Sequence, residues 1–388
     1  MPIRSIKLAN FRNLSSLNIE LSDGVNFIIG HNGTGKTSIL EAIYLLSTGR
    51  SFRTNNLAKL IKFNCEYLAI NAALASSAEQ EFTTLVDYHR NKKADKRLLL
   101  NNSAVKSIAE IAAILPVCNI DGEVFHALSS APMYRRQLYD WGVFHVKHEF
   151  LNSWRKYESV LKQRNALLRQ SEPQKPSNIN GLRDNKVWES LFIDAAVDLI
   201  QLRQKYFSLI EASFKHYISK LLPKFSYQIK LALNHGLGSE FKNSRVTDSD
   251  YLNTYLQTEL SQKLQQDLSR GYTSVGPHRM DVIFKYNDLV AKDLVSRGQE
   301  KLIIVAYYLA QLSVIKDHTG KQCTVLIDDL AAELDSESWQ LLYQQLLLTG
   351  HQLIFSAINE QNIPLEESMA GVKMFHVEQI NKSLLSTD

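Results

Sequence analysis

Between residues 30 and 37 the chain reads Gly30-His31-Asn32-Gly33-Thr34-Gly35-Lys36-Thr37. This run is a complete GxxxxGK[ST] motif, and it follows the short, apolar and β-rich stretch at 25–29. From Lys36 to Ser47 the apolar residues have helical spacing. A glycine-rich turn between a strand and a helix brings backbone N–H groups and the positive end of the helix together. The stretch therefore predicts a phosphate-binding loop.

The residue types of this loop indicate a nucleotide with its metal ion. The glycines allow tight winding of the backbone, Lys36 supplies a cation to the β and γ phosphates, and Thr37 offers a hydroxyl to Mg²⁺. We predict that all residues from Gly30 to Thr37 bind nucleotide, with Lys36 an exposed loop lysine and Thr37 a metal ligand. The alternative is a glycine-rich turn that binds no ligand.

A second signal is an apolar run at 324–327, which is followed directly by Asp328 and Asp329. A metal-bound nucleotide requires a carboxylate at the end of a strand beside the phosphate loop. We predict that Asp328 holds Mg²⁺ and that Asp329 orients or deprotonates the attacking water, which makes both candidate catalytic residues. Glu333 and Asp335 add further acidic groups. Because many buried strands end in Asp, this interpretation depends on the phosphate loop.

A third signal is Ser296-Arg297-Gly298-Gln299, which comes just before a long apolar helical pattern at 301–315. A small polar residue, a glycine and a glutamine at the start of a helix can form another phosphate-binding terminus. The same residues are also typical of a helix N-cap at Ser296 with Glu300 in the first turn. Ser296, Gly298 and Gln299 are candidate nucleotide-binding residues on the first interpretation.

Periodicity divides the 388 residues into three segments of an α/β protein. Strand patterns and the phosphate loop lie in 1–125. Helical stripes dominate 126–270, where two of them, joined by a polar loop at 171–186, predict an antiparallel hairpin. Strands and helices alternate again in 271–388. We therefore predict a nucleotide-binding head made from 1–125 and 271–388, with a β-rich part and an inserted helical lobe.

Composition excludes several classes of protein. The chain is 45% hydrophobic and 22% charged, which is near the average for a globular protein. The three cysteines, Cys65, Cys118 and Cys323, are far apart and form no CxxC pair, so neither a disulfide framework nor a zinc site is predicted. No apolar run has the length of a membrane span or of a signal-peptide core. We expect a cytoplasmic protein; the net charge of +4 decides nothing about its partners.

The order of phosphate loop, Ser-Arg-Gly-Gln and Asp-Asp resembles that of ABC-type ATPases, and the long helical insertion resembles their SMC-related branch. Within that branch the chain resembles the RecF family along essentially its whole length. The blocks that carry this resemblance are Leu8-Ala9-Asn10-Phe11-Arg12-Asn13-Leu14, Gly49-Arg50-Ser51-Phe52-Arg53-Thr54, Arg135-Arg136, 138–145, Gly276-Pro277-His278-Arg279 with Asp281, Ser296-Arg297-Gly298-Gln299 and 328–335.

The resemblance implies an ABC/SMC-like ATPase head that binds ATP and Mg²⁺. It implies an ATP-dependent homodimer in which Ser296 to Gln299 of one subunit contact the γ-phosphate held by the other. It also implies binding to single-stranded and gapped DNA, association with RecR and RecO, and assistance to RecA loading and the SOS response. A slow, DNA-stimulated ATPase is expected, with no nuclease, helicase or polymerase activity.

Three features bear on the rate of hydrolysis. The strand end at 355–357 has no histidine where transporter-type ATPases have one, and Asp329 stands where many relatives have Glu. The glutamine that usually senses the metal has only the segment 119–125 as a candidate location. All three favour slow hydrolysis. The alternative functions are an ATPase subunit of a transporter, which leaves the helical insertion unexplained, or of a nuclease complex, which predicts longer coiled-coil arms.

Two basic clusters are candidates for DNA contact, because phosphate binding requires such charges. Solvated surface positions explain each cluster equally well. His278 and Arg279 belong either to the nucleotide site or to a DNA contact. The clusters are Arg90, Lys92, Lys93, Lys96 and Arg97, and then Arg155, Lys156, Lys162, Arg164 and Arg169.

Overall fold

The structure, a computed structural model, describes residues 1–75, 82–89, 96–122, 127–170, 179–330, 333–360 and 371–378. The chain divides into two compact units, the first made of 1–125 with 315–388 and the second of 126–314. Residues 271–314, grouped above with the C-terminal part of the head, belong by their packing to the second unit. The helical insertion and the segment that carries Ser296 therefore share one unit.

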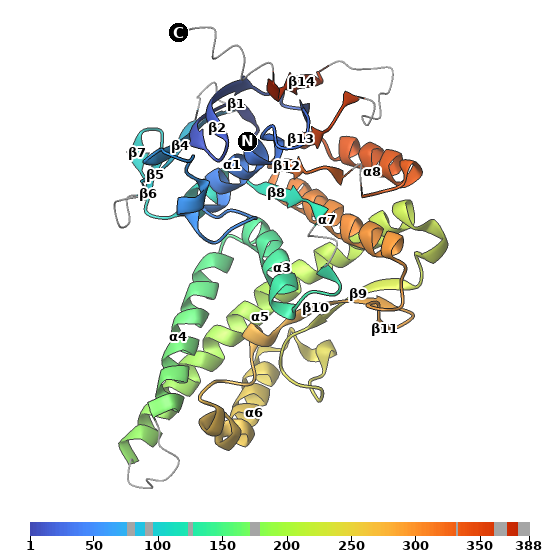
Figure 1. The fold of residues 1–388 in the computed structure, drawn as a ribbon. Coiled ribbons are helices and arrows are strands. Elements are labelled where there is room, and N and C mark those ends of the chain that lie inside the picture. Colours follow the sequence, from blue (N-terminus) through green and yellow to red (C-terminus); the bar gives the residue numbers. More distant parts are fainter. Residues whose placement is uncertain are drawn as a thin grey trace. The chain divides into compact units, whose positions relative to one another are not determined.

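A five-stranded parallel sheet runs through the first unit (Figure 1). β3, β12 and β13 are buried along their whole length, as expected for a sheet that is covered on both faces. Because the strands are parallel, their carboxyl ends lie along one edge. In sheet order the strands are β14 (Lys373–His376), β3 (Val25–Ile29), β13 (Gln352–Ala357), β12 (Thr324–Ile327) and β8 (Val117–Ile120).

A six-stranded antiparallel sheet forms the β-rich part of the first unit. Along β1 and β4, buried positions recur at about every second residue, which is the pattern of a sheet with one face on the core. In sheet order its strands are β2 (Leu14–Glu20), β1 (Ile3–Phe11), β4 (Tyr67–Leu74), β5 (Phe82–His89), β6 (Lys96–Leu100) and β7 (Ser103–Ala104).

Helix α1 (Lys36–Thr48) contacts both sheets of the first unit, packing on β8 and β13 of one and on β1 of the other. Its apolar residues Ile39, Leu40, Ile43 and Leu46 are fully buried in a core shared with both sheets. This packing fixes the helix whose first residue is Lys36. The unit also contains α2 (Ile108–Ile114), α8 (Ser336–Thr349) and the 3-10 helix η1 (Leu57–Leu60).

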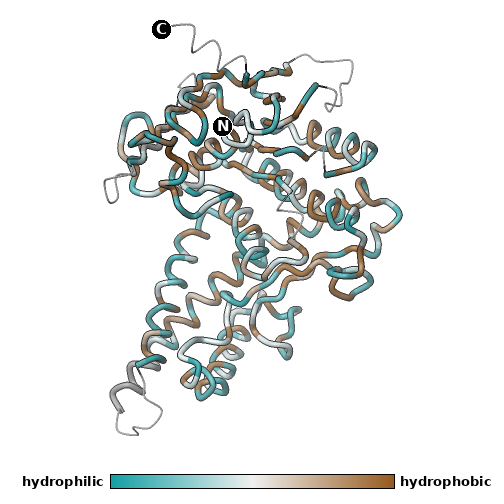
Figure 2. The backbone as a smooth tube through the Cα atoms, in the orientation of Figure 1, coloured by the Kyte–Doolittle hydropathy of each residue, from teal (hydrophilic) through white to brown (hydrophobic). Residues whose placement is uncertain are grey.

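The second unit is mainly helical. Helices α4 and α5 lie side by side and antiparallel, and α6 packs against both (Figure 1). Figure 2 shows hydrophilic and hydrophobic residues alternating along α4, as expected for a helix with one buried face. The elements are α3 (Pro132–Val146), α4 (Phe150–Gln170), α5 (Ile179–Leu221), η3 (Pro223–Phe225), β9 (Ile229–Asn234), η4 (Asn243–Arg245), α6 (Ser249–Arg270), η5 (Pro277–Arg279), β10 (Asp281–Tyr286) and β11 (Leu289–Val290).

Helix α7 (Arg297–Thr319) begins in the second unit and ends in the first. It is buried from Ile303 to Leu312 on every face, which explains why its sequence is almost continuously apolar there. Among the described residues no helix is long and apolar enough to cross a membrane.

Most of the predicted elements are confirmed, including the strand before the phosphate loop, the helix after it, and the hairpin of α4 and α5. The prediction that helical stripes dominate 126–270 misses β9, whose alternating Ile229, Leu231 and Leu233 are buried against β10. Alternation over so few residues, between two long helical patterns, is a weak signal. Sequence analysis also left α2, β8 and β14 without a prediction.

Candidate nucleotide-binding site

The loop between β3 and α1 adopts a conformation that only glycine accommodates without strain at two points. Gly33 has a φ of 83° and Gly35 a φ of 115°, both in the left-handed region. A Cβ on Gly35 would lie 2.8 Å from Leu14 Cδ2, and one on Gly30 would lie 2.7 Å from Thr34 Oγ1. The glycines are therefore required both by backbone conformation and by the close approach of neighbouring side chains.

Lys36 is buried, with 7% of its surface exposed, so the prediction of an exposed loop lysine is wrong. Its Nζ donates to the carbonyl oxygen of Gly30 at 2.6 Å and to that of His31 at 3.1 Å. The lysine therefore lies along the inner side of its own loop. This arrangement fixes the ammonium group next to the loop backbone, where the N–H groups of the loop and the helix N-terminus also attract anions.

The two predicted carboxylates lie at the end of β12, close to the start of α1. Thr37 Oγ1 is 3.2 Å from Asp328 Oδ1, although the two residues are 291 positions apart in the sequence. Ser356, on the adjacent strand β13, donates from Oγ to the same carboxylate oxygen at 2.7 Å and accepts from the backbone N–H of Asp329 at 2.8 Å. The site therefore combines side chains from the first turn of α1 and from the carboxyl ends of β12 and β13.

Asp329 differs from Asp328 in conformation and in environment. Its φ of 50° lies in the left-handed region, which Asp tolerates better than most residues. Desolvation by burial raises the pKa of its carboxyl group, the nearby charge of Lys36 opposes this, and Asp328 and Glu333 raise the pKa further. Among the described residues no hydrogen bond reaches its carboxylate, whereas Asp328 accepts two. Asp329 therefore has the oxygens that are available to a further molecule.

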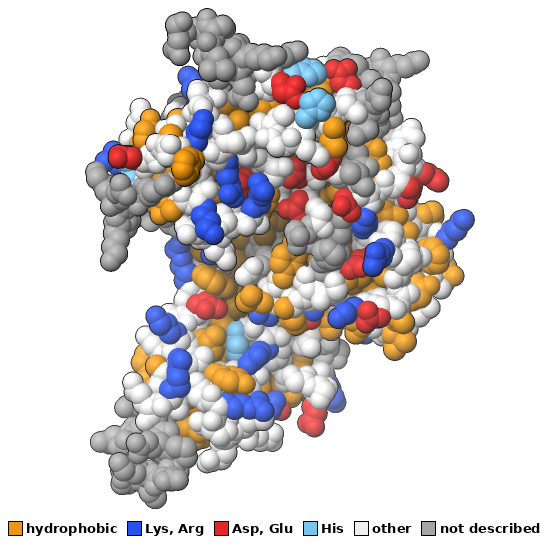
Figure 3. All heavy atoms as spheres, in the orientation of Figure 1, with side chains coloured by type: hydrophobic (Ala, Val, Ile, Leu, Met, Phe, Trp, Pro, Cys, Tyr) orange, Lys and Arg blue, Asp and Glu red, His pale blue; other side chains and the backbone are white. Residues whose placement is uncertain are grey.

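A cavity of about 1260 Å³ opens in front of the loop. Its wall contains Thr37, Asp328 and Asp329 together with several cations. Figure 3 shows Lys and Arg side chains gathered on this part of the first unit. Among the described residues no group of three His, Cys, Asp or Glu side chains could hold a metal ion alone. The cations of the wall are Arg12, Lys36, Arg53, Lys59 and Lys62.

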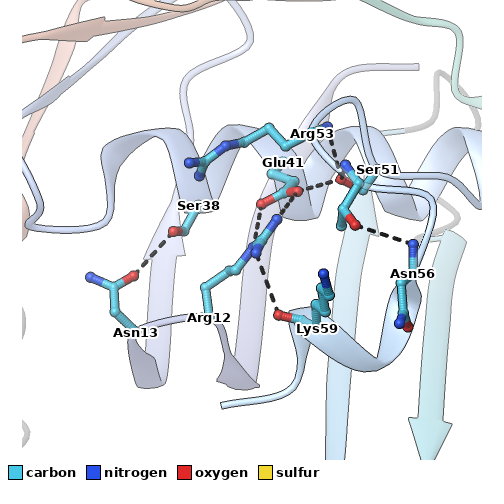
Figure 4. Close-up of polar contacts among 9 residues, drawn as sticks. Arg12, Asn13, Ser38, Glu41, Ser51, Arg53, Asn56 and Lys59 are labelled. Carbon is cyan, nitrogen blue, oxygen red and sulfur yellow. Dashed lines mark hydrogen bonds and ion pairs between the residues drawn. The ribbon is translucent and has the colours of Figure 1, made fainter. Parts of the chain in front are cut away.

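A buried carboxylate on α1 organises one wall of this cavity (Figure 4). Glu41 is fully buried and accepts two hydrogen bonds from the guanidinium of Arg12, at 2.7 and 2.9 Å, and a third from the hydroxyl of Ser51. Ser51 Oγ in turn accepts from the backbone N–H groups of Arg53 and Thr54. Glu41 therefore connects the helix of the phosphate loop to the turn after β1 and to the loop at 50–54.

The segment at the start of α7 forms a helix cap. The backbone N–H of Gln299 donates to Ser296 Oγ at 3.3 Å, and Gln299 Oε1 accepts from the backbone N–H of Ser296 at 2.9 Å. This reciprocal pair is a capping box, in which Gln299 takes the place that was considered for Glu300. Ser296, Arg297 and Gly298 are exposed, and a Cβ on Gly298 would meet nothing within 4 Å. The cap leaves the surface of this turn open to a ligand.

Of the candidate DNA-contact residues that the structure describes, several are exposed and one is buried. Arg90, Lys92 and Lys93 lie outside the described residues, Lys96 begins β6, and Arg97 is exposed. On α4, Arg155, Lys156, Lys162 and Arg169 are exposed. Arg164 is buried in an ion pair with Asp267, so its place in a DNA-contacting cluster is wrong. Helical periodicity could not reveal a partner that lies 103 residues away.

The segment proposed for the metal-sensing glutamine begins on β8. Asn119 Nδ2 donates to Asp121 Oδ2 at 2.6 Å, and a Cβ on Gly122 would lie 3.8 Å from Glu333 Oε1. The end of β8 is therefore near the acidic segment that follows β12. Residues 123–125 lie outside the described residues, so the location of this function stays a prediction.

Known proteins resemble this chain along almost its whole length. The model of the RecF/RecN/SMC N-terminal domain family matches residues 2–381. The chain is 35% identical over 379 residues to the DNA replication and repair protein RecF of Shewanella pealeana, covering 98% of both chains. The chain belongs to the RecF family. The RecF of Vibrio vulnificus is 33% identical, again over 98% of both chains.

Solved structures show the same fold. The recombination mediator protein RecF with ATPrS in the RecFOR pathway superposes with a TM-score of 0.80 at 25% identity, covering 95% of this chain and 96% of that one. An Smc head bound to the C-terminal winged-helix domain of ScpA superposes with a TM-score of 0.54 at 16% identity, covering 93% and 90%. The ABC/SMC-like ATPase head predicted from the sequence is confirmed for this RecF-family chain.

Sequence reasoning missed Ser356 and Glu41 as members of the site. Ser356 was noted only because it is not a histidine, yet its hydroxyl bonds to both aspartates. Glu41 follows the loop lysine by five positions and stands between the apolar pairs 39–40 and 42–43, and a carboxylate at such a position was the available signal. Its partner Arg12 appeared only within a block of family resemblance.

Proposed function

We propose that this chain is an ATP-dependent DNA-binding protein of DNA replication and recombinational repair. It binds single-stranded and gapped DNA as an ATP-gated homodimer, acts with RecO and RecR, and assists RecA loading and the SOS response in the cytoplasm. The relatives are named as DNA replication and repair proteins, and the RecF structures come from the RecFOR pathway. ATP hydrolysis is slow and is stimulated by DNA.

The proposal of a nucleotide site rests on one observation, the hydrogen bond between Thr37 and Asp328 beside the buried Lys36. It joins a complete phosphate-loop motif to an acidic strand end within one cavity. Mg²⁺ is bound in such sites through one or two protein oxygens together with phosphate oxygens. The hydroxyl of Thr37 and the carboxylate of Asp328 fit that donor set and would hold the ion, which would neutralise phosphate charge.

The two aspartates have separate tasks in this proposal. Asp328, fixed by Thr37 and Ser356, keeps its orientation and serves the metal. Asp329 orients the attacking water and accepts its proton, since its carboxylate is available and its pKa is raised above the ordinary value. The short Asp side chain and the absence of a histidine at Ser356 are consistent with slow turnover.

The composite site of the dimer is proposed at Ser296 to Gln299. The exposed helix start is capped within its own chain, and its N–H groups and the open surface at Gly298 suit a phosphate supplied by a second copy. Gly298 has no side chain to obstruct such an approach. Dimerisation would then require ATP, because the phosphate is what the two copies share.

A combined nucleotide and DNA assay tests the proposal. Titration with a fluorescent ATP analogue measures nucleotide affinity, and retention of gapped DNA is compared with and without ATP. The wild type should bind ATP with Mg²⁺ and retain more DNA when ATP is present. Lys36→Met should lose ATP affinity and the ATP-dependent part of DNA retention. Lys7→Met, at an exposed position of β1, removes a lysine of the same unit and should leave both unchanged.

Two results would contradict the proposal. Undiminished ATP binding by Lys36→Met would remove the phosphate loop from the site. ATP binding by the wild type without any DNA retention would instead favour the transporter-subunit alternative, in which DNA plays no part.

A further inference from the structure

The segment between α6 and β10 is fixed by a network of buried polar bonds. Arg164 Nη1 donates to Asp267 Oδ2 at 3.1 Å and to Thr273 Oγ1 at 2.6 Å. The second oxygen of Asp267 accepts from the backbone N–H of Ser274 at 3.0 Å. Arg164, Asp267 and Thr273 are all buried. Such a network holds a loop in one conformation, because each broken bond would leave a buried polar group without a partner.

The second half of the segment is held in the same way. His278 Nδ1 lies 2.6 Å from the hydroxyl of Tyr157, and its Nε2 lies 2.9 Å from the carbonyl oxygen of Thr273. Burial lowers the pKa of His278 to about 4, so the ring is neutral at pH 7, with Nε2 donating to the carbonyl and Nδ1 accepting from the hydroxyl. Arg203 donates to the carbonyl oxygen of Pro277 at 2.7 Å. The segment therefore forms a rigid support.

Three exposed arginines and one aromatic ring project from this support. The guanidinium of Arg279 lies 5.3 Å from the centre of the ring of Tyr272, whose side chain is 40% exposed. Arg169 lies over Gly271, where a Cβ would be 2.8 Å from its Cγ, and the φ of 70° at that glycine turns the chain away. Arg270 is exposed and immediately precedes that glycine. These four residues, Arg169, Arg270, Tyr272 and Arg279, are called the arginine patch.

Among the described residues, no carboxylate forms an ion pair with an arginine of the arginine patch. Two acidic residues flank the segment: Asp267 in α6, which pairs with Arg164, and Asp281 at the start of β10, which accepts two bonds from Arg135 at 2.7 and 2.9 Å. Figure 3 shows further Lys and Arg side chains exposed over α4. The inner arginines thus neutralise the acids, and the outer arginines retain their charge for a partner.

Helix dipoles explain only part of this arrangement. Arg169 and Arg270 lie in the last turns of α4 and α6, where a cation interacts favourably with the helix C-terminus. Arg279 is at the end of a 3-10 helix of three residues, which has no comparable dipole. Its contact with Tyr272 orders the guanidinium at the surface, which costs side-chain entropy without any partner for the charge.

We propose that the arginine patch binds the phosphodiester backbone of DNA. This inference rests on the proposed function, to which it adds the surface that contacts the DNA. Guanidinium groups fit phosphate oxygens in geometry and charge, and an exposed aromatic ring among them offers a face for an unpaired base. The rigid support keeps the groups in position before DNA arrives, so little freedom is lost on binding.

The test measures the salt dependence of DNA affinity in the presence of ATP. Gapped duplex DNA carrying a fluorophore is titrated at several salt concentrations between about 50 and 200 mM. Each lost phosphate contact should reduce the slope of log affinity against log salt by about 0.9 for duplex and about 0.7 for single strands. The triple variant Arg169→Gln, Arg270→Gln and Arg279→Gln should therefore lose between about 2 and 3 from the slope.

A matched control removes three charges elsewhere on the same unit. Lys215, Lys220 and Lys224 are exposed, and Lys215 lies 23 positions beyond Phe192, which is the α5 residue that approaches Gly276. At 1.5 Å per helical residue this is roughly 35 Å from the support. Changing the three lysines to Gln should leave the slope nearly unchanged. ATP affinity and the unfolding midpoint are measured for every variant to show that the fold is intact.

The outcomes separate this inference from the proposed function. A wild type that binds no DNA with ATP overturns the proposed function, and the inference with it. A wild type that binds DNA, with the same slope in the triple variant, overturns the inference alone. If the triple variant loses stability but keeps the slope, the arginines serve only the helix ends. If Arg279→Gln alone reduces the slope by about 1, the inference is supported, because no helix dipole accounts for the position of this arginine.

Discussion

Replacing Glu41 by Gln should weaken both the first unit and its nucleotide site. Glu41 is fully buried and accepts two hydrogen bonds from Arg12 and one from Ser51. Gln keeps the shape but replaces one oxygen by an NH₂ group, which would face the N–H groups of the guanidinium. The ion pair is lost, at most one of the two bonds from the guanidinium is kept, now to an uncharged amide oxygen, and two donors are left facing each other.

The expected loss in the free energy of unfolding follows from the burial of Glu41 and Arg12. Breaking a buried ion pair by removing one partner costs about 3 to 5 kcal/mol. The Arg12 side chain is 22% exposed, so its guanidinium can recover part of its hydration, which places the expected loss at about 3 kcal/mol. Because Arg12 also lines the cavity, its displacement should lower ATP affinity. The variant should therefore show both defects together.

Urea unfolding without nucleotide measures the first effect, since bound ATP would itself stabilise the folded state. Titration with a fluorescent ATP analogue measures the second. Glu20→Gln, at an exposed position of the neighbouring strand β2, is the matched control and should change neither. The reasoning is refuted if Glu41→Gln unfolds within about 0.5 kcal/mol of the wild type and binds ATP equally well, because that is the behaviour of a surface position.

A double variant separates the effect of the ion pair on stability from its effect on ATP affinity. Arg12→Met combined with Glu41→Leu replaces the ion pair by apolar side chains, and such replacements are often neutral or stabilising. Stability should then recover toward that of the wild type, apart from the cost of the unpaired Ser51 hydroxyl, which is about 1 kcal/mol. ATP affinity should stay low, because the cation at the cavity wall is gone. Full recovery of ATP affinity would show that Arg12 serves the fold only.

Three further predictions concern hydrolysis, dimerisation and pH. Asp329→Asn should keep ATP affinity and accumulate an ATP-bound dimer, seen by sizing chromatography, while phosphate release slows; turnover at the wild-type rate would remove its proposed role. Ser296→Arg should bind ATP yet stay monomeric, at a capping cost of about 1 kcal/mol, and mixing it with Lys36→Met should restore partial ATPase activity through the one composite site free of both changes. For His278, burial lowers the pKa from 6.5 to about 4, so the unfolded state binds the proton more tightly. Its contribution to stability is present above about pH 6.5 and is lost as the pH falls to about 4, by about 3 kcal/mol in all. The free energy of unfolding in urea should therefore decrease less between pH 7 and pH 5 for His278→Gln than for the wild type.

The conformation of the loop at 30–37 could be predicted from the sequence because it depends on local features. Spacing within eight positions determines both the conformation and the donors, and the flanking strand and helix have clear periodicity. Ser356 could not be identified in this way. Its role depends on β13 lying between β3 and β12, and no residue pattern along the chain specifies that sheet order.

Buried charges were the main source of error in reading side chains. Arg164 has the spacing of an α4 residue among other basic residues, and its burial follows from Asp267 on another helix. Lys36 was expected to be exposed because loops are at the surface, but its own loop folds around it. In both positions the sequence indicates the charge correctly, and the tertiary contact that removes the charge from solvent is not visible in periodicity.

The proposed nucleotide site requires both ends of the chain. Thr37 lies at the start of α1, and its partner Asp328 is supplied 291 residues later by a strand that is buried on all sides. Ser356 then joins the two aspartates from a third segment, at the strand that separates β3 from β12. A change that loosens the parallel sheet at any of these strands therefore moves one set of oxygens relative to the others. Since hydrolysis depends on the relative positions of phosphate, metal and water, such a change should reduce turnover before it abolishes nucleotide binding by the loop itself.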